Sequence, residues 1–87
     1  MLENGNKVFI RTVTYHLVGA VTGRETVGKT TFLVLENASW VADSGRFHVA
    51  IARGELSEVE FVGHALVNVA AITDAFPWHH ELPTTSK

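Results

Sequence analysis

Apolar and β-branched residues are arranged along the first half of the chain in a pattern that favours strands over helices. Lys7–Val21 is rich in Val, Ile, Thr and aromatic residues, which pack well on a pleated surface. The stretch is long for one strand, and Gly19 within it predicts a bend or bulge. Gly23–Gly28 predicts a turn, after which the strand pattern resumes at Thr30–Ala42. The middle of this second stretch is apolar on both faces, which indicates that it is covered on both sides.

One segment near the middle of the chain has a helical pattern. Residues 44–53 place Phe47 and Ile51 one helical turn apart, and Gly54 suits the helix exit. Asp43 or Ser44 can cap the start. We expect a helix of two turns at most.

The strand pattern returns after this helix and then gives way to an irregular tail. Glu58–Ile72 predicts one or two strands with a break at Gly63. Pro77 and Pro83 bracket the tail, which carries aromatic and histidine residues. The pattern as a whole predicts a mostly β fold with one short helix.

Length and composition limit the possibilities further. The chain of 87 residues is 46% hydrophobic, which suits one packed domain over 1–87, with 1–6 and 84–87 expected to be flexible. Cysteine is absent, so a small domain with a thin stability margin has no disulfides and is expected to gain stability by association. No apolar run suits a membrane span, and Met1–Lys7 lacks the order of a signal peptide, so we expect a cytoplasmic protein without membrane contact.

A phosphate-binding pattern is present but lies in the wrong context. Gly23–Thr30 reads Gly-x-x-x-x-Gly-Lys-Thr, in which glycine N–H groups and a lysine would cradle phosphates. Such a loop must open a helix, whereas Thr31–Glu36 predicts a strand. The chain is also too short for the parallel α/β sheet of a nucleotide-binding domain. We therefore interpret the segment as a simple turn between strands.

Two segments resemble the sequence motifs of Sm and LSm proteins. Leu17–Ala38 is similar to the first motif, with Gly19 in the second strand and Leu33–Ala38 in the third, where Asn37 replaces the usual aspartate. Ala65–Ile72 looks like a shortened second motif. Other stretches look like small uncharacterised phage proteins, including those of cyanophages, which would place the protein in the cytoplasm of a bacterial host.

The resemblance implies an architecture and a mode of assembly. It implies a small, strongly bent, five-stranded antiparallel Sm-like barrel, into which the helix at residues 44–53 is inserted. Barrels of this family pair edge strands to form closed rings, here expected to hold about five to seven copies. The expected interface residues belong to an uncharged, proline-free edge and are Leu66, Val67, Val69 and Ala71. The alternative is that another strand of the same barrel covers this edge.

The same resemblance points to a nucleic-acid site, which we predict at Arg24, Lys29, Thr30, Phe32 and Asn68. Phe32 replaces the family's base-reading asparagine, Asn68 replaces the arginine that sandwiches the base, and Thr30 occupies the stacking position. These departures argue against the family's usual way of reading RNA. Cations such as Arg24 and Lys29, repeated around a ring, could instead hold a phosphate backbone without reading bases.

The remaining candidate sites each have an ordinary explanation. Trp78, His79 and His80 could form a docking strip for a partner, or a cap over the barrel end. The five histidines are dispersed and cysteine is absent, so we expect no metal and no cofactor. Glu58 and Glu60 share one side of a strand but have no acid–base partner in the pattern, so we expect no enzyme.

Two functions therefore stay open. The first is a homo-oligomeric ring that binds RNA or single-stranded nucleic acid non-specifically through a cationic rim. The second is a structural or protein-interaction component, such as a phage-encoded ring or adaptor. The net charge of −2 and the scattered basic residues weigh against the first.

Overall fold

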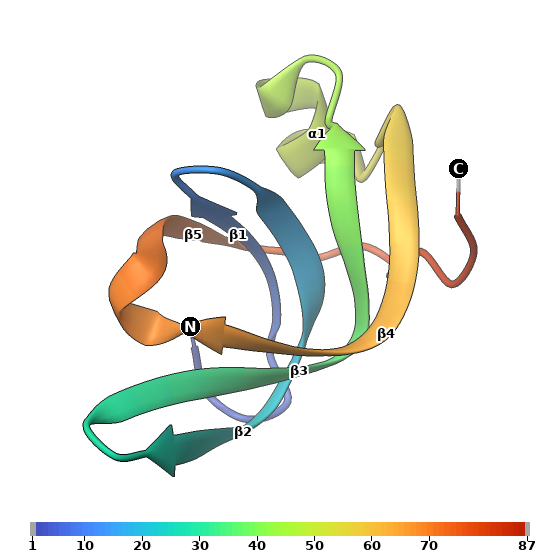
Figure 1. Cartoon of the computed structure of the whole chain (residues 1–87). Coiled ribbons are helices and arrows are strands. Elements are labelled where there is room, and N and C mark those ends of the chain that lie inside the picture. Colours follow the sequence, from blue (N-terminus) through green and yellow to red (C-terminus); the bar gives the residue numbers. More distant parts are fainter. Residues whose placement is uncertain (1, 87) are drawn as a thin grey trace.

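A single five-stranded antiparallel sheet, in the order β4-β3-β2-β1-β5, organises the chain, of which the computed structural model describes residues 2–86 (Figure 1). The strands are β1 (Lys7–Thr12), β2 (His16–Val27), β3 (Thr30–Asp43), β4 (Glu58–Asn68) and β5 (Ile72–Pro77). Helix α1 (Phe47–Arg53) joins β3 to β4, and a 3-10 turn, η1 (Val69–Ala71), joins β4 to β5. The predicted fold class, a curled five-stranded antiparallel sheet with one short helix, is confirmed.

The turns that join β1 to β2 and β2 to β3 are both short. Lys7–Val21 divides at residues 13–15, where the Thr12 N–H donates to the Tyr15 carbonyl at 2.9 Å and the Thr12 hydroxyl bonds both the N–H and the carbonyl of Tyr15. The turn between strands predicted at Gly23–Gly28 is present but shorter, because β2 continues to Val27 and only Gly28, with a φ of 61°, and the following lysine turn the chain. The phosphate-loop pattern therefore lies in a β-hairpin that leads into a strand.

The helix begins three residues later than predicted. Its N-cap is Arg46, which makes no side-chain cap, because the Asp43 carboxylate instead accepts the Gly45 N–H at 2.8 Å and turns the chain ahead of the helix. The exit is as expected. Gly54 adopts a left-handed φ of 72° and its N–H donates to the Ala50 carbonyl.

The last predicted strand also ends early. β4 stops at Asn68, whose side-chain oxygen accepts the Ala70 N–H at 2.9 Å and starts the 3-10 turn. The extension of this edge strand to Ile72 is therefore wrong, and Ile72 instead begins β5. Polar side chains that compete for backbone N–H groups commonly interrupt strands in this way.

Three backbone positions bend the sheet along one line across β2, β3 and β4. The β2–β3 register shifts at Gly19, and the β3–β4 register shifts around Ala38, which is opposite Gly63. Asn37 has a φ of 51° and Gly63 a φ of 81°, so both adopt left-handed conformations. β3 and β4 consequently follow strongly curved paths (Figure 1).

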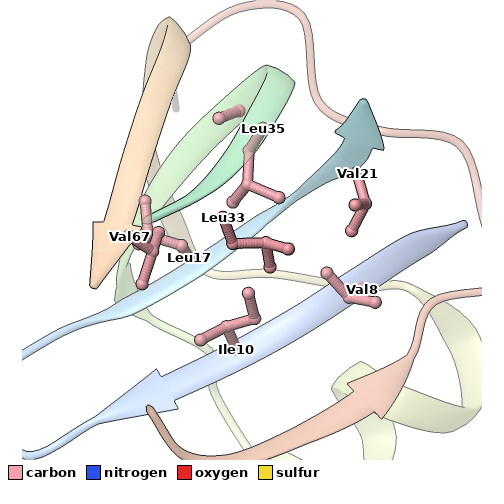
Figure 2. Close-up of a cluster of buried hydrophobic side chains, with 8 residues drawn as sticks. Val8, Ile10, Leu17, Val21, Leu33, Leu35 and Val67 are labelled. Atoms are coloured by element: carbon pink, nitrogen blue, oxygen red, sulfur yellow. The ribbon is translucent and has the colours of Figure 1, made fainter. Parts of the chain in front are cut away.

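The bend produces two hydrophobic layers on opposite faces of the sheet. The inner layer lies on the concave face (Figure 2) and consists of Val8, Ile10, Leu17, Val21, Leu33, Leu35, Ala38 and Val67. The outer layer lies between the sheet, α1 and the C-terminal tail and consists of Phe9, Val18, Val41, Ala50, Leu56, Val59 and Trp78. The alternation of Val8, Phe9 and Ile10 supplies both layers from one strand, because successive side chains point to opposite faces.

The chain ends, which the sequence predicts to be flexible, make specific contacts. The Gly5 N–H donates to the Val21 carbonyl at 2.6 Å, and the Phe61 N–H donates to the Ser86 hydroxyl at 3.1 Å. The outermost positions of the predicted flexible ends, Met1 and Lys87, lie outside the described residues.

The bend leads to a test of stability. A Cβ atom at Gly19 would lie 3.3 Å from the Cα and Cβ of Ala38 and from the Cβ of Leu35, so Gly19→Ala requires β3 to shift by a few tenths of an ångström. We expect Gly19→Ala to lower the free energy of unfolding by about 1–3 kcal/mol in urea titration. Gly23→Ala is the matched control in the same strand, because its Cβ would meet no atom within 4 Å. Equal effects of the two substitutions would show that close packing at Gly19 is not required.

Candidate functional site

Three of the five predicted nucleic-acid residues come together where the β2–β3 hairpin meets the end of β4. Lys29, Thr30 and Asn68 line a shallow pocket of about 300 Å³ together with Thr31, Val69 and Ala70. Lys29 is exposed, and no residue of the described part of the chain forms an ion pair with it. The pocket therefore offers one available cation beside hydroxyl and amide groups.

The other two predicted residues contribute less. Phe32 is opposite Asn68 in the sheet register and is only partly exposed. The Arg24 guanidinium donates to the Leu2 carbonyl at 2.6 Å, so it is engaged with the start of the chain. Because the Asn68 oxygen caps η1, only the amide N–H groups of Asn68 are available to a ligand.

Neither outer edge of the sheet has a neighbouring strand among residues 2–86, although the tail bonds the β4 edge where the Phe61 N–H donates to the Ser86 hydroxyl. β4 pairs with β3 alone and β5 pairs with β1 alone, so the alternative that the barrel covers its own edge is wrong for the described chain. Leu66, in β4, is 44% exposed. Val69 and Ala71 are also exposed, but they lie in η1 rather than in the strand.

One predicted interface residue belongs to the core instead. Val67 has no exposed surface and packs in the inner layer opposite Leu33, so the prediction that its side chain forms an intersubunit contact is wrong. The period of two in a strand explains this result, because Leu66 and Val67 must point to opposite faces.

The predicted docking strip is folded onto its own chain. Trp78 is 2% exposed, its ring centroid lies 5.9 Å from that of Phe9, and its indole N–H donates to the Glu81 carbonyl. The His80 Nε2 donates to the Ile51 carbonyl at 2.8 Å, and the Lys7 ammonium donates to the His80 carbonyl. The prediction of Trp78 as a docking residue is thus wrong, whereas His80 is half-buried and bonded to α1. The tail acts as a cap, although over the outer face and α1 rather than a barrel end, and only His79 of the strip is exposed.

Two features escaped prediction because they depend on tertiary contacts. Tyr15 and Trp40 form an exposed pair of stacked rings. On the opposite face, an ion pair joins Arg11 in β1 to Asp74 in β5, with nitrogen–oxygen distances of 2.7 and 2.5 Å. The Arg11 guanidinium carbon also lies 4.5 Å from the centroid of the Phe47 ring, so the ion pair links the sheet edge to α1.

Other site types are not formed by the described residues. Within residues 2–86, no three His, Asp or Glu side chains gather in a way that could hold a metal ion. In the same range, no helix is both long and apolar enough to cross a membrane.

Comparisons with models of protein families, with curated proteins and with solved structures give no significant match. The functional argument therefore depends on the geometry of the chain itself.

The Arg11–Asp74 pair predicts a pH dependence of stability. Hydrogen bonds donated by Arg11 lower the pKa of the Asp74 carboxyl below its usual value, and the positive charge of Arg11 adds to the effect. A lowered folded-state pKa contributes stability above the unfolded pKa of about 3.9, and this contribution is lost as pH falls through the folded pKa. Asp74→Asn should therefore have a lower Tm than the unsubstituted protein near neutral pH and a flatter Tm profile below about pH 4.

Thermal unfolding followed by circular dichroism at a series of pH values measures both effects. Glu81→Gln is the control, because the Glu81 side chain forms no hydrogen bond or ion pair within residues 2–86. Identical profiles for Asp74→Asn and the unsubstituted protein would mean that the ion pair contributes nothing to folding in solution.

Proposed function

We propose that this chain is an Sm-like assembly module whose copies join edge to edge into a closed ring of about five to seven subunits. One observation carries the proposal, namely that β4 and β5 are both unpaired edges of the same curled sheet. Unpaired N–H and C=O groups in a row are a ready template for another strand. Pairing of β4 in one copy with β5 in the next is a head-to-tail contact. Such contacts generate a closed ring when the rotation that relates neighbouring copies brings the last copy back to the first.

The character of the β4 edge supports this assembly. Leu66 is half-exposed on an edge segment, 65–68, that has no charged residue and no proline to block a second strand. Strand pairing would satisfy the open backbone groups and remove Leu66 from water at the same time. A chain this small gains more from such burial than a large one, because its own core is limited.

In this proposal the ring acts by binding or as a structural component, not as a catalyst, and uses no cofactor. The proposed location is the cytoplasm, which would be that of a bacterial host for a phage-encoded protein. The cysteine-free composition supports a reducing compartment.

A charge on the β4 edge tests the assembly. Leu66→Lys places an ammonium where a second strand would pair, so we expect the closed oligomer to give way to monomer in native mass spectrometry. Val13→Lys is the control, because Val13 is 91% exposed in the β1–β2 turn, away from both edges. The fold of both variants is checked by circular dichroism. A monomeric unsubstituted protein, or an oligomer that Leu66→Lys leaves intact, would contradict the proposal.

A second candidate function is sequence-independent binding of single-stranded nucleic acid by the same ring. The pocket at Lys29, Thr30 and Asn68 favours it, because one free ammonium per subunit becomes a cationic rim when the subunit is repeated. Phe32 lies beside this pocket and could add stacking. The chain's net charge of −2 restricts such binding to the rim.

Lys29→Ala tests this second function. We expect it to weaken binding of a labelled single-stranded oligonucleotide severalfold at low salt and to flatten the dependence of log K on log salt concentration, because one phosphate contact per subunit is lost. Arg53→Ala is the control, since Arg53 ends α1, at the other end of the molecule from the β2–β3 hairpin (Figure 1). Fluorescence anisotropy measures both. If the unsubstituted protein binds no oligonucleotide at low salt, the nucleic-acid function is wrong and only the structural role remains.

A further inference from the structure

An exposed pair of aromatic rings lies beside the β4 edge strand, because Trp40 belongs to the neighbouring strand, β3. Trp40 of β3 is 50% exposed and Tyr15 of the β1–β2 turn is 39% exposed. Their ring centroids lie 6.1 Å apart with an interplanar angle of 28°, so the rings are stacked. The other tryptophan, Trp78, is 2% exposed, which shows that this fold can bury an indole. Large aromatic groups left in water commonly mark an interaction surface.

The backbone holds this pair in place. Trp40 is opposite Leu17 in the β2–β3 register, so its side chain lies on the concave face, next to the buried Leu17 of the inner layer. The Tyr15 backbone is held because Thr12 bonds both its N–H and its carbonyl. Both rings therefore project from a held backbone, which limits the ordering that ligand binding requires.

Carboxylates flank the rings on the β4 side. Glu60 is directly opposite Trp40, and Glu58 is directly opposite Asp43 in the β3–β4 register. Like charges in opposite positions of a sheet are unfavourable. No cationic side chain within residues 2–86 forms an ion pair with Glu58 or Glu60. A positive charge supplied from outside would be attracted both to the Glu60 carboxylate and to the indole face of Trp40.

We propose that Tyr15, Trp40 and Glu60 form a docking surface for an arginine-bearing segment of a partner protein. An arginine guanidinium is planar, stacks on aromatic faces and pairs with carboxylates, so one side chain can satisfy both Trp40 and Glu60. Charge complementarity selects this occupant over a nucleic acid, since the same carboxylates repel phosphates. The surface includes neither Lys29 nor Leu66, although Glu60 belongs to the same edge strand, β4, as Leu66.

The test is a titration of the full-length protein with a labelled hexa-arginine peptide at low salt. We expect saturable binding that quenches tryptophan fluorescence, and the signal reports on Trp40 because Trp78 is buried. Peptide anisotropy should show that Trp40→Ala lowers the affinity about tenfold and that Glu60→Gln lowers it about threefold. Tyr15→Ala provides a second aromatic variant, with native folding of all variants checked by circular dichroism.

Two controls separate this surface from general attraction to a negatively charged protein. Glu25→Gln removes an exposed carboxylate in the β2–β3 hairpin and should leave the affinity unchanged. A hexa-citrulline peptide, which keeps the shape and loses the charge, should not bind. No saturable binding, or binding that Trp40→Ala and Glu60→Gln leave unchanged, would overturn the proposal. The proposal would also be wrong if a single-stranded oligonucleotide bound to the protein and Trp40→Ala abolished that binding, because the rings would then stack on bases.

Discussion

The fold depends on the close approach of β2 to β3 at Gly19. Only a residue without a side chain fits there against Ala38 and Leu35 without displacing them. The left-handed backbone of Asn37 and Gly63 continues this line across β3 and β4, so the sheet bends as one unit rather than twisting gradually. The bend allows one sheet to enclose the inner hydrophobic layer on its concave face and to carry a second layer on its convex face.

The convex layer explains what the helix and the tail contribute. The bent sheet leaves Phe9 and Val18 on its outer face, where they would otherwise face water. α1 covers part of this surface, and the tail covers more of it through Trp78, whose backbone N–H is held by the Lys7 carbonyl. Trp78 and His80 of the tail thus serve the stability of the fold, and the surfaces proposed for binding lie elsewhere.

Three surfaces remain open to partners, and each has a different chemistry. The β4 and β5 edges offer unpaired backbone groups, which suits a strand of another copy. The hairpin pocket offers the Lys29 ammonium, which suits a phosphate. The Tyr15–Trp40 pair offers aromatic faces beside Glu60, which suits a cation. The first and third surfaces adjoin each other, because Glu60 belongs to β4.

The sequence by itself determined the fold class, because β-branched residues and the alternation of apolar positions favour strands through local backbone and packing preferences. It also placed the bend at Gly19 and the helix exit at Gly54, where only glycine suits the geometry. Tertiary structure alone decided where strands end and which side chains are exposed. Asn68 ended β4 by capping η1, Val67 turned inward, and Trp78 folded onto Phe9. Such outcomes depend on partners distant in sequence, so residue type and spacing do not specify them.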